Sequence, residues 1–116
     1  MNSLNSLNSV LVEGELTADP VLEQTSAGTP ICRMEIVSTR SFNNGNSFEL
    51  ETSIFDVEAR ANLAETCSEH LTKGRNVRCI GRLKQDRWTT ADGVARCGIK
   101  VVAEHVEFRP SRRNNG

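Results

Sequence analysis

The spacing of the apolar residues changes once along this chain, and that change limits the folds that it can adopt. Most of the chain alternates apolar and polar residues or is rich in Val and Leu, as strands are. Residues 59–74 instead carry apolar side chains at helical spacing and predict one amphipathic helix of about three turns. The helical positions are Leu63, Ala64, Cys67 and Leu71. We expect Lys73 and Gly74 to end this helix, with Gly74 as its C′ residue.

Five segments have the character of strands, and turn residues separate them. The polar run 43–47 and the Asp92-Gly93 pair both predict turns, and the second is a strong hairpin signal. Gly81 and Gly98 lie inside strand segments, where a bulge or a bend is expected. The expected strands are residues 9–16, 31–39, 48–58, 76–88 and 95–108.

Alternation in the second of these segments predicts which side chains face the interior. Cys32, Met34 and Ile36 are expected on one face, and Arg33 and its alternating neighbours on the other. Short antiparallel strands that bend at internal glycines favour a closed or nearly closed barrel. The expected fold class is therefore all-β with one helix: a five-stranded OB-fold barrel with the helix between strands 3 and 4. The usual ligands of this fold are oligonucleotides and oligosaccharides.

The charge of the chain is unevenly distributed, although its formal net charge is only -1. Residues 73–100 hold eight basic and two acidic residues, whereas residues 49–69 hold six acidic and one basic residue. Two solvated faces of opposite sign would account for this pattern. The only tryptophan, Trp88, lies inside the basic segment, and a ring among cations is typical of a nucleic-acid surface.

Several classes of protein find no support in the sequence. The four cysteines have no CxxC spacing, and neither His70 nor His105 has a ligand pattern around it, so no metal site is expected. Nucleophile-elbow, P-loop and zinc-protease motifs are absent, so we expect no enzyme and no cofactor. No leader-like segment and no run of 18 apolar residues occur, so we expect no membrane span, a cytoplasmic location and reduced, mostly buried thiols.

The order of the motifs resembles the bacterial single-stranded DNA-binding protein (SSB) family, roughly over residues 7–110. NSVLVEGELTADP resembles the opening strand of the family, SAGTPICRMEI its second strand and LAETCSEHLTKG its helix. GRLKQDRWTTADG resembles its Trp-containing hairpin, and VVAEHVEF its closing strand. The resemblance implies nonspecific coating of single-stranded DNA in replication, recombination and repair, by nucleoid-associated proteins that are commonly homotetramers.

The resemblance also implies which side chains stack on bases. Two aromatic positions of the family fall on Phe42 and Trp88, which keep a ring, and two others fall on Ile54 and Arg60. Ile54 offers apolar contact without a π-face, whereas the planar guanidinium of Arg60 can stack on a base and also pair with phosphate. The alternatives are purely structural: Trp88 could lie in the core or cap the hairpin, and Phe42 could close the mouth of the barrel. We expect weaker stacking and a larger electrostatic contribution than in a typical member.

Basic side chains around these rings are candidates for phosphate contacts, although each one alone could simply be solvated. Arg78 lies deeper in its strand and could instead pair with the acidic 49–58 strand or lie at a subunit interface. The candidate phosphate contacts are Arg33, Arg40, Lys73, Arg75, Arg82, Lys84 and Arg87.

The expected organisation is a flexible extension over residues 1–6, the OB-fold domain over 7–109 and a disordered polar tail over 110–116. Members of the family usually end in an acidic tip that recruits replication and repair proteins, and RPSRRNNG has no such tip. An alternative function is therefore that of a primosome-like OB-fold accessory protein, which acts mainly by binding other proteins.

Overall fold

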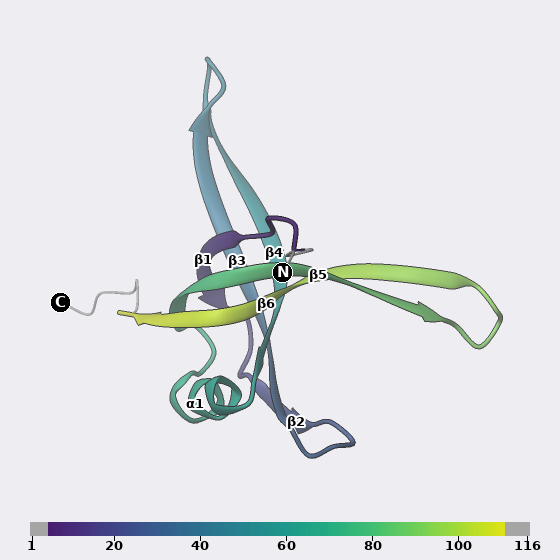
Figure 1. Ribbon diagram of the computed structural model, residues 1–116. Helices are drawn as coiled ribbons and strands as arrows, with labels where there is room; N and C mark the ends of the chain where they lie inside the picture. Colours follow the sequence, from purple (N-terminus) through teal and green to yellow (C-terminus); the bar gives the residue numbers. More distant parts are fainter. Residues whose placement is uncertain (1–4, 111–116) are drawn as a thin grey trace.

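The computed structural model describes residues 5–110. Most of the extension predicted for residues 1–6 and of the tail predicted for 110–116 lies outside these described residues. The elements are β1 (Val10–Leu16), β2 (Val21–Gln24), β3 (Pro30–Asn43), β4 (Phe48–Arg60), α1 (Asn62–His70), β5 (Asn76–Thr89) and β6 (Ala95–Arg109) (Figure 1). None of the helices in the described part of the chain is long and apolar enough to cross a membrane.

Five of the strands close into the predicted barrel. The hydrogen-bonded order is β1-β5-β6-β4-β3, and β1 closes the ring by pairing with β3 at Glu15↔Val37 and Leu16↔Ile36. All pairs are antiparallel except β4 with β6, which run parallel at Val57↔Val101. The fold-class prediction is confirmed, and α1 lies between the third and fourth barrel strands. The short strand β2, which extends the sheet beside β3, is not among the strands predicted from the sequence.

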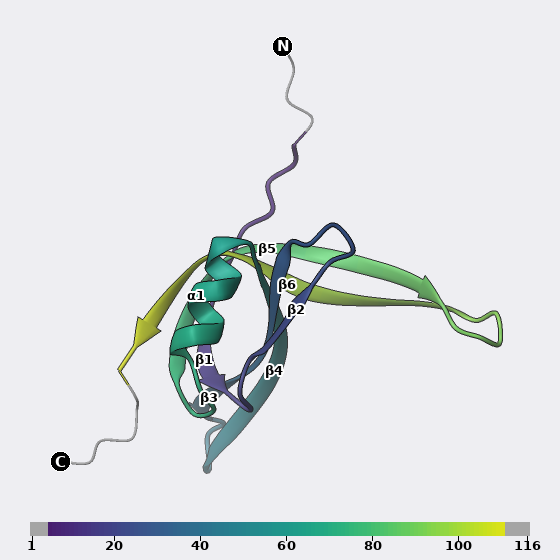
Figure 2. The same cartoon turned by 90° about the horizontal axis from the view of Figure 1, so that it is seen from below.

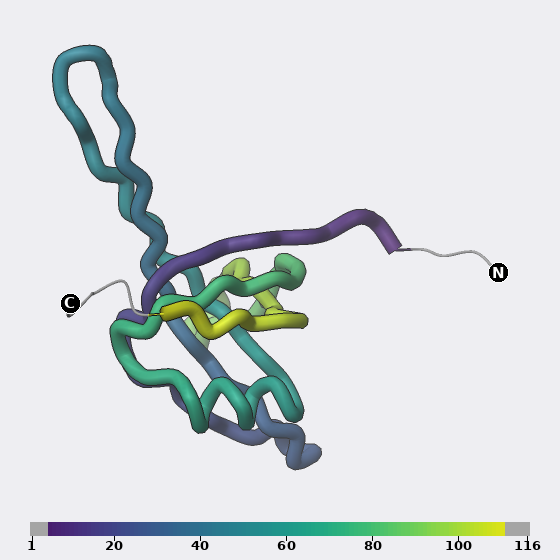
Figure 3. The backbone as a smooth tube through the Cα atoms, turned by 90° about the vertical axis from the view of Figure 1, so that its left-hand side faces the viewer, coloured from purple at the N-terminus to yellow at the C-terminus, as the bar shows by residue number. Residues whose placement is uncertain are grey.

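Two long hairpins leave the barrel in different directions (Figures 1 and 3). The β3–β4 hairpin turns at Asn44, whose amide donates to the Ser47 carbonyl, and Gly45 takes a φ of 106°. The β5–β6 hairpin turns between Thr90 and Val94, as predicted. The first hairpin is longer than expected, because strand pairing continues as far as the exposed tip residues, which show no apolar alternation.

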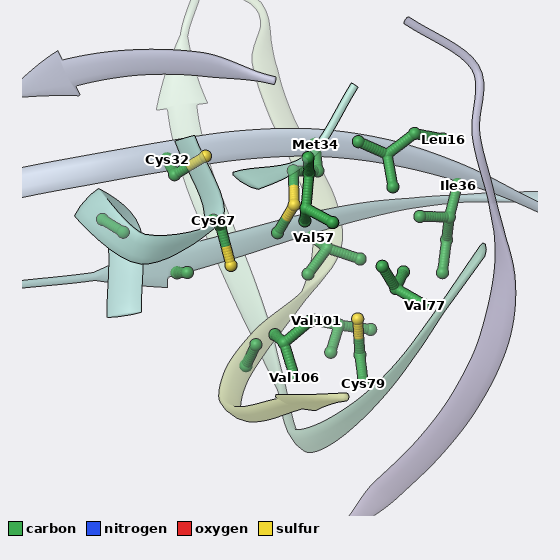
Figure 4. Close-up of a cluster of buried hydrophobic side chains, with 14 residues drawn as sticks. Leu16, Cys32, Met34, Ile36, Val57, Cys67, Val77, Cys79, Val101 and Val106 are labelled. Carbon is green, nitrogen blue, oxygen red and sulfur yellow. The ribbon is translucent and has the colours of Figure 1, made fainter. Parts of the chain in front are cut away.

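The core lies inside the barrel and is covered at one end by α1 (Figures 2 and 4). Cys32, Met34 and Ile36 point inward, as alternation predicts, and belong to the same buried cluster as Cys67 of α1. Burial raises the pKa of the Cys67 thiol to about 12, so this group is a neutral apolar filler. Cys79 is also buried, whereas Cys97 is exposed on the β5–β6 hairpin.

Glycine has different roles at Gly81 and Gly98, the two positions inside β5 and β6 where a bulge or bend was predicted. At Gly81 the β5–β6 register shifts, and an added Cβ would lie 2.0 Å from the Val102 carbonyl oxygen. The predicted bulge is therefore present, and only glycine permits this close approach of two backbones. Gly98 instead pairs in regular register with Asp86, so the bend predicted there is not a register shift.

The helix ends earlier than predicted. His70 is its last residue, and Leu71 is already extended, with φ -108° and ψ 145°. Leu71 is buried in the core, and its amide donates to the Cys67 carbonyl. Gly74 is therefore not the C′ residue: it takes a φ of 89° in the turn into β5, where its amide donates 2.8 Å to the Leu16 carbonyl.

Candidate nucleic-acid interface

A groove of about 500 Å³ runs over the outer face of the barrel between the β5–β6 hairpin and the segment that links β1 to β2. Strand alternation places outward-facing side chains of β3, β4 and β6 along its floor. Its walls come from β5–β6 and from the segment between β1 and β2. The residues that line it are Thr17, Ala18, Asp19, Val21, Arg33, Met34, Glu35, Asp56, Val57, Glu58, Asp86, Trp88, Gly98, Ile99 and Lys100.

Trp88 forms one wall of this groove and remains 51% exposed. Its six-membered ring packs beside Gly98, where an added Cβ would lie 3.5 Å from Cη2. The ring is absent from the core cluster, so the core alternative for Trp88 is wrong. On the hairpin it also borders a second hollow, which contains Arg87 and Arg96. Trp88 therefore stands between the groove and a basic hollow.

An ion-pair network crosses the floor of the groove from β4 to β5. The buried carboxylate of Glu58 accepts from Arg60 Nε at 2.6 Å and lies 2.5 Å from Lys100 Nζ. Lys100 Nζ also lies 2.9 Å from Asp86 Oδ2, and Asp86 Oδ1 lies 2.7 Å from Lys84 Nζ. Alternating charges thus join three strands through Glu58, Lys100 and Asp86, which line the groove, while Arg60 and Lys84 flank it.

The network shifts the pKa values of its members. Burial raises the pKa of Glu58, but hydrogen bonds from Lys100 and Arg60 outweigh burial and hold it below its ordinary value. Hydrogen bonds from Lys84 and Lys100 lower the pKa of Asp86 to about 2. Both carboxylates are therefore ionised at neutral pH.

The floor of the groove carries more negative than positive charge. Asp19, Glu35 and Asp56 line it together with the two carboxylates of the network, and they face only Arg33 and Lys100 as cations. Glu35 and Asp56 are directly opposite in the β3–β4 register. A phosphate backbone is repelled from such a floor. It would instead run past the hollow that contains Arg87 and Arg96, while the bases turn toward the groove.

The two base-contact candidates on the β3–β4 hairpin point to different faces. Val37↔Ile54 and Phe42↔Glu49 are cross-strand pairs, so alternation puts Ile54 on the outer face and Phe42 on the face of Ile36. Phe42 lies on the projecting part of the hairpin and is outside the core cluster, so it is no plug of the barrel mouth. Phe55 lies opposite Ile36, on the other face from Ile54, as expected.

Most of the predicted phosphate contacts have acidic or polar neighbours on the surface. Arg33 Nε lies 2.8 Å from Glu23, Arg82 Nε 3.9 Å from Glu104, and Arg87 Nε donates to Gln85. These contacts are exposed, so each is weak, and each arginine can exchange its carboxylate or amide partner for a phosphate. Arg40 lies on the β3–β4 hairpin, across from Glu51.

Lys73 and Arg75 lie at the far end of β5 from Trp88 and are not brought to the groove wall that Trp88 forms. Arg75 Nε donates to the Arg109 carbonyl at 3.0 Å, and its guanidinium lies 6.0 Å from the centre of the Phe108 ring. Arg78 pairs with Glu13 and Glu107, so the expected alternative of pairing with the 49–58 strand is wrong.

Sequence reasoning missed four residues of this surface: Glu58, Gly98, Lys100 and Arg96. Arg96 is the cross-strand partner of Trp88. Counting outward along both strands from the Asp92-Gly93 turn would have identified this pair. Glu58 and Lys100 gave no signal of their own, because an acidic residue on β4 and a basic residue on β6 look like ordinary solvated positions. Among residues 5–110, no three His, Cys, Asp or Glu side chains gather into a group that could hold a metal ion.

The closed five-stranded barrel, with a half-exposed indole and a basic hollow on its long hairpin, places this protein among the OB-fold proteins. The model of the single-strand binding protein family matches residues 7–109, and the chain belongs to that family. It is 35% identical over 112 residues to single-stranded DNA-binding protein 2 of Chlorobaculum tepidum, which covers 95% of this chain and 76% of the relative.

Two further comparisons agree in family and in fold. The single-stranded DNA-binding protein of Aquifex aeolicus is 35% identical over 103 residues, which covers 88% of this chain and 69% of the relative. A solved structure described as a Plasmodium falciparum SSB complex with ssDNA superposes with a TM-score of 0.83 at 19% identity, over 95% of this chain and 100% of that one. At this identity the superposition establishes the fold.

Proposed function

We propose that this protein binds single-stranded DNA without sequence preference and protects it in replication, recombination and repair. The observation that carries the proposal is the position of Trp88, half exposed between an acidic groove and the basic hollow of Arg87 and Arg96. A base that stacks on the indole leaves its phosphate within reach of the cations on the hairpin. The relatives named as single-stranded DNA-binding proteins support the same ligand.

Binding combines stacking with phosphate neutralisation. Trp88 and Arg60 offer planar groups and Ile54 adds apolar contact on the outer face, whereas Phe42 offers its ring on the other face of the β3–β4 hairpin. Each base–aromatic stack contributes roughly 1–3 kcal/mol. With Ile54 and Arg60 at two stacking positions, phosphate contacts supply a larger part of the affinity. The contacts proposed near the groove are Arg33, Arg40, Arg82, Lys84 and Arg87, with Arg96 added from the structure, and Lys73 and Arg75 would contact only a strand that continues beyond the groove.

A fluorescence titration tests this proposal directly, because Trp88 is the only tryptophan. Adding a thymidine oligonucleotide is expected to quench its emission, and added salt is expected to reverse the quench. The logarithm of the binding constant should fall with the logarithm of salt concentration by about 0.7 for each phosphate neutralised. Emission that does not change when DNA binds would remove Trp88 from the site.

The assembly that fits this function is a homotetramer acting in the cytoplasm on nucleoid DNA, so that one strand can wrap several barrels. Its support is a second hollow, separate from the groove of Trp88, in which Leu11 of β1, 67% exposed, and Leu50 of β4, 72% exposed, lie among polar residues. Light scattering of the purified protein gives the mass, and a monomer at micromolar concentration would contradict the assembly. The proposed role includes no catalysis.

A second candidate is an accessory role through protein–protein contacts, and one surface favours it. The outer face of the β3–β4 hairpin carries Phe48, Leu50 and Ile54 without a charged residue among them, and Phe48 is 76% exposed. Weak binding of a long thymidine tract together with tight binding of a replicative helicase would support this role. Submicromolar affinity for the tract at moderate salt supports DNA binding instead.

A further inference from the structure

Glu58 is a charged side chain that the barrel buries under the groove. Its side chain is only 3% exposed, although it points to the outer face of β4. Burying an unpaired carboxylate is costly, so its position depends on the two cations that contact it. One oxygen accepts from Arg60 Nε at 2.6 Å, and the other lies 2.5 Å from Lys100 Nζ. Both oxygens are therefore engaged.

The contact with Glu58 fixes the guanidinium of Arg60 in one orientation. A free arginine on a surface samples many rotamers, and ordering its side chain on binding costs conformational entropy. Here the Nε–H is held from two residues away on the same strand, while the side chain stays 47% exposed. The hydrogen bond uses only Nε, so the terminal Nη groups and the plane of the guanidinium remain available to a ligand.

The contact with Lys100 holds Glu58 in place. Lys100 is 18% exposed and bridges Glu58 to Asp86, which joins β4 to the β5–β6 hairpin that carries Trp88. Burial lowers the pKa of Lys100, but its hydrogen bonds to both carboxylates outweigh burial and raise it, so the lysine stays charged. The carboxylate that orients Arg60 is thus anchored to the hairpin of the groove wall.

We propose that Glu58 is a positioning residue that makes Arg60 a preformed stacking platform for a DNA base. This inference rests on the proposed function and adds to it the means by which an arginine replaces a ring. Preorganisation removes the ordering cost from the binding step, so Arg60 contributes to binding through the base and not only through phosphate. Without Glu58 the guanidinium keeps its charge and loses its fixed plane.

The test measures the base-dependent part of binding. Fluorescence anisotropy gives the dissociation constants of a thymidine oligonucleotide and of an abasic oligonucleotide with the same phosphates, and their ratio isolates base contacts. Arg60→Ala should lower the preference for the thymidine strand by roughly 5- to 150-fold, the loss of one stack. Glu58→Gln should lower it by about threefold, because one amide oxygen must serve both Nε and Lys100.

The double variant separates positioning from a general effect on the fold. If Glu58 acts through Arg60, adding Glu58→Gln to Arg60→Ala lowers the preference no further. Glu107→Gln makes the same chemical change in the ion pair with Arg78, outside the groove, and should leave the preference unchanged. Arg60→Lys, which keeps Glu58 and the charge but lacks the plane, should lower the preference as much as Arg60→Ala does and retain affinity for the abasic strand.

Two results would overturn the proposal. The first is a Glu58→Gln effect that is equal for both strands or that persists in the Arg60→Ala background. The second is an Arg60→Lys variant with the wild-type preference, a result that does not depend on whether Glu58→Gln folds. Failure of the wild-type protein to bind either strand would instead refute the proposed function.

Discussion

The indole of Trp88 rests beside the α-carbon of Gly98 on the neighbouring strand. A Cβ at position 98 would lie 3.5 Å from Cη2 and 3.6 Å from Cζ3, which is ordinary van der Waals contact. The glycine therefore leaves room for the ring to lie close to the strand, and a single methyl group would fill that room without displacing it. A branched side chain has additional atoms in the same space and would push the ring away.

This geometry predicts opposite results for two substitutions of Gly98. Gly98→Ala should keep DNA affinity within about twofold and raise stability by roughly 0.4–1 kcal/mol, because its φ is not positive and alanine restricts the unfolded chain. Gly98→Val should displace the indole and lower affinity. Titration of a thymidine oligonucleotide measures the affinities and thermal unfolding the stabilities. Equal DNA affinities for the two variants would show that binding does not depend on the position of the indole against residue 98.

Gly81 provides the contrast within the same pair of strands. Its added Cβ would lie 2.0 Å from the Val102 carbonyl oxygen, which is backbone and cannot move aside. Gly81→Ala should therefore destabilise the barrel by about 3 kcal/mol or more. Urea unfolding of Gly81→Ala and Gly98→Ala shows whether stability is lost through the clash with the Val102 backbone or through the replacement of any strand glycine. Similar unfolding free energies for the two variants would contradict this account of the bulge.

Trp88→Ala should weaken binding of single-stranded DNA by roughly 1–3 kcal/mol, which is about 5- to 150-fold. The loss should be larger than in relatives with a ring at all four stacking positions, because Ile54 and Arg60 replace two of them here. Trp88→Phe should lose less. Anisotropy titrations with a labelled oligonucleotide measure both variants, and an unchanged affinity in Trp88→Ala would contradict the stacking role.

The barrel was predictable because its signals are local. Alternation identified Cys32, Met34 and Ile36 as core, the Asp92-Gly93 pair placed a hairpin, and Gly81 marked a bulge. The strand β2 was missed because all four of its residues are exposed and give no alternation. The helix end was missed because Leu71 continues the helical spacing, although it is buried from an extended backbone.

The site was only partly predictable because its key contacts join residues far apart in the sequence. Trp88 was proposed mostly from the family resemblance and also from its charged neighbours, and its exposure in the structure agrees with a surface role. The contact between Glu58 and Lys100 spans 42 positions, and nothing in either local segment indicates it. Arg75 was grouped with the other cations by sequence proximity, yet its side chain contacts Arg109 at the opposite end of β5.

Ala61 adopts a backbone conformation that favours glycine. Its φ is 58° and its ψ -131°, at the junction between Arg60 and α1, and its amide donates to the Pro30 carbonyl at 2.9 Å. A positive φ costs a residue with a Cβ about 1–2 kcal/mol. Ala61→Gly should remove this strain and, after the added entropy of the unfolded chain, raise stability by up to about 1 kcal/mol. A lower melting temperature in this variant would show that the strain is absent.

Glu58 should make the stability of the barrel depend on acid pH. Its pKa in the folded protein is below the ordinary value of 4.5, because hydrogen bonds from Lys100 and Arg60 outweigh the opposing effect of burial. The unfolded chain therefore binds the proton more readily, so the contribution of Glu58 is complete above about pH 4.5 and is lost as pH falls through the folded pKa. Asp86, lowered from 3.8 to about 2, extends the loss to lower pH.

A comparison of wild-type protein with Glu58→Gln tests this dependence. The variant lacks the ionisable group, so its unfolding free energy should be lower at neutral pH and should fall less steeply on acidification. Urea unfolding at a series of pH values from about 6 to 3 should show the difference between the two proteins shrinking as pH falls. Because Glu107→Gln leaves this network intact, it should follow the wild-type slope in that range. A difference that stays constant down to about pH 3 would show that Glu58 stabilises the barrel by packing and not by its charge.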